Sequence, residues 1–435
     1  MNATRAILDF AAQDHALPGA ARADALRMLG DTLAGGAAGA MSPAAQAILP
    51  MTASWGDGGA SRILGQNGLL PKPSAAFFNA FAIHCLEWDG VHEGAVVHAM
   101  SVVTGALLAA SDAQGGSDAE EFLTALALGV DIASGMGISA TEPMRFFRPA
   151  TAGLIGAAMA VARLEGLPPE RFADVLGLAH SFASGTMQAH VEASIALPLQ
   201  IANAARSAVT VVDLAKAGMN GPHDMLEGPF GYSALLDPLD LTLYTGNMGQ
   251  IWRISEVAIK PFPSGRASHG GLGALAQLRE ECGLSLGNVA KIELFAPPLI
   301  QRLVGRPYKQ DMTAAYARLC FPILAPLMLR DGVIDPSLFV GDELHDEHLT
   351  ALAQNVAISL DGNPDGNAMT PQRVVVTLTS GEQIDHLIPA TLGSIENPMS
   401  TAQAAQKYAL CRRLAAPDHD PRLFDDPLKY TVDPR

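Results

Sequence analysis

The sequence predicts a mainly α-helical protein into which a smaller α+β domain is inserted. Three observations support this fold class. Alanine-rich runs with apolar residues three and four positions apart occupy the chain up to about residue 253. Short β-branched runs separated by helical stretches follow up to about residue 395, and a helical pattern then returns. We therefore predict a large all-helical domain from residues 1–253 and 396–435, and a small α+β domain from residues 254–395.

The all-helical domain is predicted to hold a series of helices rich in small residues. Turn signals mark their ends: the pair Gly35-Gly36 closes the first helix, and Gly166 follows a later one where a C-cap glycine is expected. The predicted helices are residues 20–36, 73–86, 101–114, 118–138, 151–165, 168–185 and 197–218. Helices with so many alanines and glycines pack closely, so most of them are expected inside the domain.

The α+β domain is predicted from a change of pattern after Trp252. Ser380-Gly381 reads as a hairpin turn that follows the last predicted strand. The predicted strands are residues 257–262, 289–296, 356–360 and 373–379, and the predicted helices are residues 267–282 and 313–329. A final helix at residues 401–414 is expected to pack back on the first domain.

The composition argues against several functional classes. Of 435 residues, 49% are hydrophobic and 17% are charged, so the chain can bury a large interior. Its 28 Lys and Arg against 44 Asp and Glu give a formal net charge of −16, which argues against binding to nucleic acids or anionic membranes. An anionic substrate must then be held by a few local cations.

Cysteine spacing and missing motifs narrow the chemistry further. Cys85, Cys282, Cys320 and Cys411 lie far apart without metal-ligand spacing, so we predict neither disulfides nor a metal site. The apolar stretch 94–111 contains a histidine and many small residues, and we interpret it as a buried helix, not a membrane span. No signal peptide is recognisable, so we expect a cytoplasmic protein. The absence of HExxH and P-loop motifs leaves acid–base chemistry without a cofactor as the enzyme hypothesis.

The densest group of titratable side chains lies between His84 and His98. This segment holds three imidazoles and three carboxylates, including Glu87 and Asp89. A carboxylate beside a histidine fixes its tautomer and raises its basicity, as a general base near neutral pH requires. The alternative is a solvated acidic loop in which His98 caps a helix.

Two further segments place cations just before a predicted helix. In the first, Lys260 and Arg266 precede His269, where free backbone N–H groups at the start of the helix suit a carboxylate. The alternative there is an ordinary Pro/Gly turn. In the second, Arg145 and Arg148 precede another helix, and a surface loop with arginines is the simpler interpretation.

Motifs along nearly the whole chain carry a resemblance to a known family. They are Asp31-Thr-Leu-Ala-Gly35, Phe78-Asn-Ala80, His84-Cys-Leu-Glu87-Trp88-Asp89, Lys260-Pro-Phe-Pro-Ser264 and Gly393-Ser-Ile-Glu-Asn397-Pro398. In this order they resemble the MmgE/PrpD family, which includes 2-methylcitrate dehydratase, cis-aconitate decarboxylase and iminodisuccinate epimerase. The resemblance implies a large all-α domain from both chain ends, an inserted α+β lid, a homodimer, and no metal or organic cofactor.

The resemblance also assigns site residues. His98 matches the family's histidine after the acidic segment, and His269 matches the histidine at the start of the lid helix. Glu87 and Asp89 fall where the first and second acidic residues of the motif are expected. We therefore predict His98 and His269 as base and acid, with Glu87 or Asp89 orienting an imidazole.

Other positions depart from the family pattern. Arg148 stands where dehydratases and decarboxylases of the family carry a histidine, and a guanidinium does not release its proton near neutral pH. Leu197 replaces a lysine, and Phe321 replaces a tyrosine, with Arg318 at the position of a nearby serine. The predicted substrate-binding residues are Arg148, Lys260, Arg266, Arg318, Leu197 and Phe321.

The predicted function is abstraction of a proton next to a carboxylate of a small carboxylic acid, without a cofactor. A lyase of the dehydratase or decarboxylase type is the first hypothesis. An epimerase or isomerase of a small di- or tricarboxylate is the second, because two histidines are enough for a two-base reaction. A catalytically silent paralogue that only binds a ligand is the third, since three motif positions are substituted.

Overall fold

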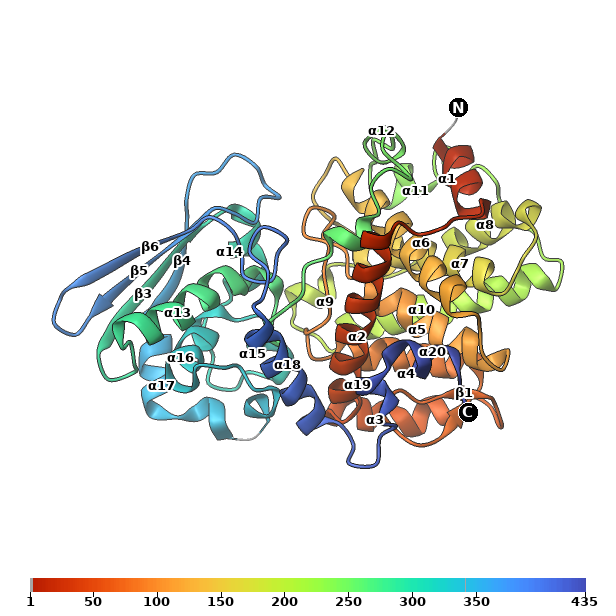
Figure 1. Ribbon diagram of the computed structural model, residues 1–435. Coiled ribbons are helices and arrows are strands. Elements are labelled where there is room, and N and C mark those ends of the chain that lie inside the picture. Colours follow the sequence, from red (N-terminus) through yellow and green to blue (C-terminus); the bar gives the residue numbers. More distant parts are fainter. Residues whose placement is uncertain (1–2, 341) are drawn as a thin grey trace. The chain divides into compact units, whose positions relative to one another are not determined.

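The computed structural model describes residues 3–340 and 342–435, which fold into two compact units (Figure 1). The helical unit holds the chain up to Cys85, Asp89–Ala258 and Tyr408–Arg435. The α+β unit holds Leu86–Trp88 and Ile259–Lys407. The predicted class, mainly α with a smaller α+β domain, is confirmed. The α+β unit begins and ends later than the predicted bounds of residues 254–395.

The three residues Leu86–Trp88 belong to the α+β unit although their neighbours on both sides belong to the helical unit. The indole of Trp88 is buried, and its Nε1 donates to the carbonyl oxygen of Pro261 at 3.2 Å. Lys407 donates to the carbonyl of Trp88 and lies over its ring. The predicted bounds placed this segment in the all-helical domain, because its contacts with the α+β unit lie far away along the chain.

The helical unit is built around α4, α5, α6, α7 and α10, which pack on one another (Figure 1). Its elements are α1 Ala3–Ala12, α2 Gly19–Ala40, α3 Pro43–Ala53, β1 Ser61–Arg62, β2 Leu69–Leu70, α4 Lys72–His84, α5 Ala99–Ala113, α6 Ala119–Ile138, α7 Arg148–Leu164, η1 Pro169–Arg171, α8 Phe172–Phe182, α9 Gln188–Val191, α10 Ala196–Lys216, α11 Tyr232–Leu235, α12 Thr242–Thr245, η2 Arg253–Glu256, α19 Arg422–Asp425 and α20 Pro427–Val432.

Helix α2 shows why small residues matter in this unit. The predicted stop at Gly35-Gly36 is wrong, because α2 continues to Ala40. A Cβ added at Gly36 would lie 2.5 Å from a methyl of Leu64, and one at Gly39 would lie 1.9 Å from the carbonyl oxygen of Ala82. These glycines therefore serve close helix packing, not helix termination.

The apolar stretch 94–111 forms a loop followed by α5, whose residues are almost all buried. Among the described residues one helix, α6, is long and apolar enough to cross a membrane, and 89% of its most apolar window is buried inside the protein. Such burial is typical of a core helix.

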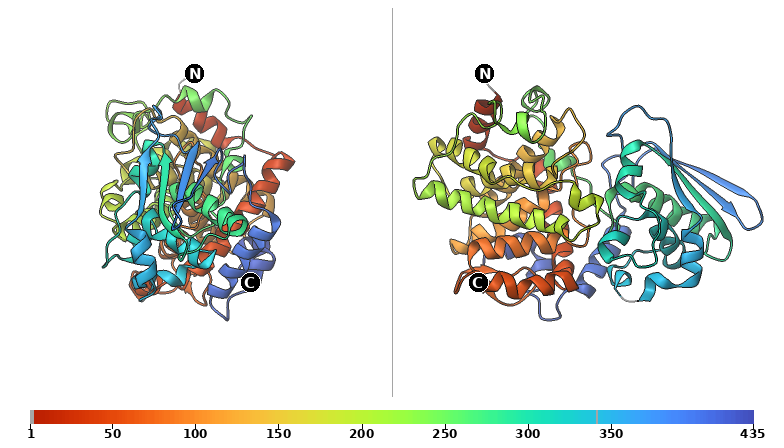
Figure 2. Two further views of the ribbon diagram at one scale, coloured as in Figure 1. Left: turned by 90° about the vertical axis from the view of Figure 1, so that its left-hand side faces the viewer. Right: turned by 180° about the vertical axis from the view of Figure 1, so that it is seen from behind.

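The α+β unit consists of a four-stranded sheet with α13 and α16 packed against one face (Figures 1 and 2). The strand order is β4-β3-β5-β6, with β3 and β4 parallel and the other pairs antiparallel. Its elements are η3 Arg266–Ser268, α13 His269–Cys282, β3 Val289–Ala296, α14 Pro298–Val304, α15 Ala314–Ala317, α16 Phe321–Asp331, η4 Pro336–Phe339, η5 Asp342–His345, α17 Glu347–Ala353, β4 Val356–Leu360, β5 Gln372–Leu378 and β6 Gln383–Ile388. Helix α18, Thr401–Leu414, begins in this unit and ends in the helical unit.

Two predicted elements of this region are wrong. Residues 257–262 do not form a strand, since only Ala258 makes an isolated bridge, to Val91, and the prolines that follow cannot donate to a ladder. The predicted helix 313–329 is two helices, α15 and α16. The break falls at Cys320, which is extended, just before a new helix that has Pro322 in its first turn.

Asp131 on α6 ties this helix to two later segments of the helical unit. Its carboxylate accepts from the hydroxyl of Tyr244 at 2.7 Å and from the backbone N–H of Arg253 at 3.0 Å. Burial raises the pKa of Asp131 to about 6, against the opposing effect of these hydrogen bonds. The folded protein therefore keeps a proton that the unfolded chain loses at lower pH.

The sign of the resulting pH dependence follows from linkage. Between about pH 4 and pH 6 the folded state binds more protons at Asp131 than the unfolded state does. Its contribution to the free energy of unfolding is therefore expected to fall by about 3 kcal/mol as pH rises through this window. Asp131→Asn should remove that slope. Urea unfolding of both proteins from pH 4 to pH 7 checks this, and parallel curves would contradict it.

Candidate functional site

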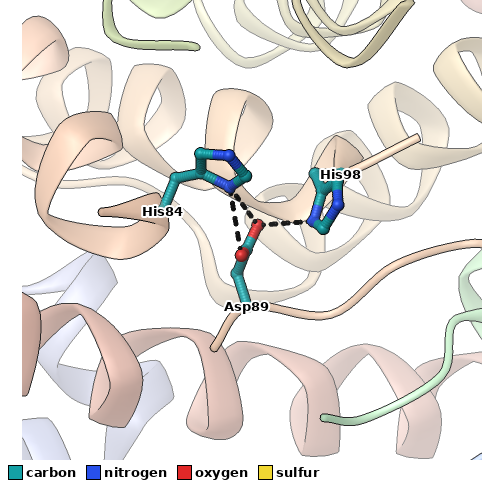
Figure 3. Close-up of side chains that lie close together, drawn as sticks. All are labelled: His84, Asp89 and His98. Carbon is teal, nitrogen blue, oxygen red and sulfur yellow. Dashed lines mark hydrogen bonds and ion pairs between the residues drawn. The ribbon is translucent and has the colours of Figure 1, made fainter. Parts of the chain in front are cut away.

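A buried carboxylate joins two imidazoles in the helical unit (Figure 3). His84 ends α4, Asp89 lies in the following loop, and His98 is the N-cap residue of α5. The Nδ1 atom of His84 lies 3.1 and 3.0 Å from the two carboxylate oxygens of Asp89, and Nδ1 of His98 lies 3.0 Å from Oδ2. The hydroxyl of Ser101, on the first turn of α5, donates to the same Oδ2.

The surroundings keep Asp89 ionised. Burial by itself would raise the pKa of Asp89, but the charges of His84 and His98 and their hydrogen bonds hold it well below its usual value. An ionised carboxylate is only an acceptor, so both imidazoles donate their Nδ1–H to it. In the neutral imidazole of His98 the lone pair then lies on Nε2.

His98 is better placed than His84 to meet a substrate. The side chain of His98 is 13% exposed, whereas that of His84 is 1% exposed. The two rings meet edge to face, with centroids 4.9 Å apart. The arrangement thus presents one oriented imidazole, His98, with a basic Nε2, and a second imidazole that helps to hold the carboxylate in place.

The same three side chains are also the described group most able to hold a metal ion. Each of His84, Asp89 and His98 offers one ligand atom, and these atoms lie within 4.8 Å of one another. Both Nδ1 atoms, however, lie at hydrogen-bond distance from Asp89. Their hydrogens then occupy the space between nitrogen and oxygen in which a cation would have to bind. The absence of a metal stays a prediction.

A second cluster, in the α+β unit, carries positive charge. Lys260 is fully buried and donates through Nζ to the carbonyl oxygen of Glu87 at 2.9 Å and to its carboxylate at 3.2 Å. Glu87 has a φ of 56°, in the left-handed region that non-glycine residues seldom adopt. Arg266 donates to the carbonyls of Leu392 at 2.6 Å and Thr391 at 3.4 Å.

His269 lies at the start of α13 beside these cations. Its Nε2 is 3.1 Å from the hydroxyl and 3.2 Å from the carbonyl of Ser264, and its Nδ1 is 3.4 Å from Nη1 of Arg266. Burial, then Arg266, then Lys260 lower the pKa of His269 well below its usual value. The imidazole is therefore neutral near pH 7, which argues against its predicted role as a protonated acid.

The structure changes the interpretation of Arg148. This residue begins α7, is 4% exposed, and pairs with the buried Asp237, with Nε 2.6 Å from Oδ2. Its remaining donors reach the carbonyls of Ala95 and Glu142. A guanidinium engaged in this way is poorly placed to clamp a substrate carboxylate, so the substrate-binding role predicted for Arg148 is not supported.

The other predicted substrate-binding residues are buried within their own units. Phe321 is fully buried in the hydrophobic core of the α+β unit, where its ring packs against Gly271. This position indicates a packing role. Arg318 in the same unit is largely buried, with its guanidinium over the ring of Phe339. Leu197 is buried at the start of α10 in the helical unit.

The structure therefore brings together two separate sets of predicted residues. Asp89 and His98 meet in the helical unit, and Glu87, Lys260, Arg266 and His269 cluster in the α+β unit.

Sequence reasoning assigned no role to three residues that complete these sets, namely His84, Ser101 and Ser264. His84 and Ser101 could have been found from their positions on the last turn of one predicted helix and the first turn of the next, which bracket the acidic loop. Ser264 carried no signal beyond its place in the Lys-Pro-Phe-Pro-Ser motif.

Comparison with known proteins covers nearly the whole chain. The MmgE/PrpD N-terminal domain profile matches residues 7–240, and the MmgE/PrpD C-terminal domain profile matches residues 262–422. A cis-aconitate decarboxylase of Homo sapiens is 26% identical over 399 residues, covering 88% of this chain and 81% of the relative. The Mus musculus protein of the same name is 26% identical over 361 residues, covering 78% and 71%. One from Aspergillus terreus is 24% identical over 396 residues, covering 85% and 80%.

Proposed function

The chain belongs to the MmgE/PrpD family, and from this premise we propose that it is a lyase-type enzyme acting on a small carboxylic acid by proton transfer through His98. The observation that carries the proposal is the hydrogen bond from His98 Nδ1 to the ionised Asp89, at 3.0 Å, which orients the ring and places the basic lone pair on Nε2. The names of the relatives, cis-aconitate decarboxylases, support an unsaturated tricarboxylate as a candidate substrate.

The same imidazole serves either lyase reaction, in opposite protonation states. In a dehydration, neutral His98 takes the proton from the carbon next to the carboxylate, the β-hydroxyl leaves as water with a proton from solvent or a second acid, and a C=C bond forms. In a decarboxylation, the bond to the carboxylate breaks, CO2 leaves, and the carbanion takes a proton from protonated His98. Asp89 stabilises the imidazolium in both, because its carboxylate stays ionised.

The α+β unit gathers positive charge in a chain whose overall charge is negative. With a formal net charge of −16, the protein repels an anionic substrate at long range. Lys260 and Arg266 concentrate positive charge around the neutral imidazole of His269. That these two cations bind a substrate carboxylate stays a prediction, because Lys260 already donates to Glu87 and Arg266 to the carbonyl of Leu392.

A deuterium-exchange experiment tests this function. The purified protein is incubated in deuterated water with a panel that includes cis-aconitate and other hydroxy, unsaturated and imino/amino di- and tricarboxylates, and proton NMR follows each compound. Vinyl signals that appear or change, together with deuterium incorporation, are the expected result. Exchange without net conversion would favour an epimerase or isomerase, and silence across the panel with measurable binding would favour the silent paralogue.

The pH profile separates the two lyase reactions. A dehydration that needs neutral His98 should run faster as pH rises, whereas a decarboxylation that needs the imidazolium should slow down.

A further inference from the structure

The loop that leads into His98 is held at one residue, Ala95, from several sides. The N–H of Ala95 donates to Nδ1 of His92 at 3.2 Å, and its carbonyl accepts from Nη1 of Arg148 at 3.0 Å. A Cβ added at Gly137 of α6 would lie 2.7 Å from both the Cβ and the carbonyl oxygen of Ala95, so the two segments are in close contact. Both polar backbone groups of Ala95 are thus engaged, three residues before the predicted base.

The loop has little freedom of its own. Its ends are joined by a bridge between His92 and Val97, and Val96 has a left-handed φ of 52°. The imidazole of His92 also donates through Nε2 to Glu256 at 3.0 Å, because its Nδ1 is already an acceptor. A loop in a strained backbone conformation keeps its shape only where its surroundings impose it.

Arg148 is the centre of these surroundings. Its guanidinium donates to Asp237 through Nε at 2.6 Å and Nη2 at 3.3 Å, to Ala95 through Nη1, and to the carbonyl of Glu142 through Nη2 at 3.3 Å. One side chain therefore connects the loop before His98 with two other loops of the helical unit. Asp237 offsets a positive charge that would otherwise be buried at the N-terminal end of α7.

We propose that Arg148, held by Asp237, is a positioning residue that fixes His98 through the carbonyl group of Ala95. The inference rests on the proposed role of His98 in proton transfer. It explains how a guanidinium serves the reaction without touching the substrate: the ion pair sets its orientation, and the hydrogen bond to Ala95 transmits that orientation to the loop. Displacement of an acid–base group by about 1 Å can cost about 10²-fold in rate.

The decisive comparison is between Arg148 and Arg62, two arginines of the helical unit that each pair with a buried aspartate. Arg148→Gln should lower kcat by about 10- to 100-fold and leave KM within about twofold, because the base is displaced while substrate contacts remain. The matched control is Arg62→Gln. Arg62 also pairs bidentately with a buried carboxylate of the helical unit, Asp112, and donates to a backbone carbonyl, that of Tyr430. Arg62→Gln should lower Tm to a similar extent as Arg148→Gln and leave kcat unchanged.

Asp237→Asn separates positioning from substrate binding. Under the proposal it loosens Arg148 and lowers kcat in the same direction as Arg148→Gln. If Arg148 bound a substrate carboxylate instead, removal of the competing Asp237 would lower KM and preserve kcat, and the proposal would fail. Arg148→Lys keeps the charge but not the forked geometry, and it guards against a glutamine variant that does not fold. It should give an intermediate kcat at unchanged KM.

Amide hydrogen exchange tests, independently of activity, the clamp that Arg148 forms on the loop before His98 through the carbonyl of Ala95. Peptides that contain residues 92–98 should exchange faster in Arg148→Gln and Arg148→Lys than in the wild-type protein or in Arg62→Gln. Unchanged exchange would overturn the clamp. Faster exchange with an unchanged kcat would overturn the positioning role while leaving the proposed function intact. If the wild-type protein transfers no proton to any substrate, the proposed function fails, and the exchange rates still report on the clamp.

Discussion

His98→Asn is expected to lower kcat by about 10²–10⁴-fold, the loss typical of an acid–base group, with the fold preserved. The carboxamide can still donate to Asp89, so the packing of the loop has a substitute hydrogen bond, but it cannot exchange a proton near neutral pH. Deuterium incorporation at the substrate carbon and turnover, measured on the compound that the NMR panel identifies, check this result.

An exposed histidine that contacts an aspartate provides the matched control for His98. His223 also contacts a carboxylate, that of Asp174 at 2.9 Å, but its side chain is 64% exposed. His223→Asn should leave kcat and KM unchanged. A loss below tenfold in His98→Asn would assign this histidine a structural role and move the search for the base to the α+β unit.

Asp89→Asn is the second change with a large expected effect. Asp89 accepts hydrogen bonds from His84, His98 and Ser101, and a carboxamide turns one of its two acceptor atoms into a donor. The imidazole of His98 then loses both its fixed tautomer and the negative charge that stabilises its protonated form. We expect kcat to fall by about 10²–10⁴-fold, as in other histidine–aspartate pairs.

The pH dependence of stability gives an independent readout for Asp89. Because its pKa is lowered well below the usual value in the folded state, the carboxylate contributes stability above the unfolded-state pKa of about 3.9. That contribution is lost as pH falls through the folded-state pKa. Acid unfolding of Asp89→Asn should lack this loss, whereas the control Asp14→Asn, at a fully exposed carboxylate, should retain it. A wild-type acid-unfolding profile in Asp89→Asn would show that the carboxylate is not held ionised.

Several features of the fold followed from local pattern. The family could be predicted because its motifs occur as short segments in a fixed order. Both domain profiles confirm this membership. The strands β3 and β4 begin and end where predicted, since β-branched runs bounded by turns leave few alternatives. Glycines misled the prediction at α2, because a glycine that ends a helix and one that admits a neighbouring helix look alike in a single sequence.

Tertiary contacts decided the chemistry that each predicted residue can perform. The sequence by itself determined the family, the class of fold and the segment that holds Asp89 and His98. Only the folded chain sets His84 and His98 on one carboxylate, pairs Arg148 with a residue 89 positions away, and buries His269 among cations so that its imidazole is neutral. Hydrogen bonding and pKa depend on burial and on charges brought close by long-range packing, and no local pattern encodes these.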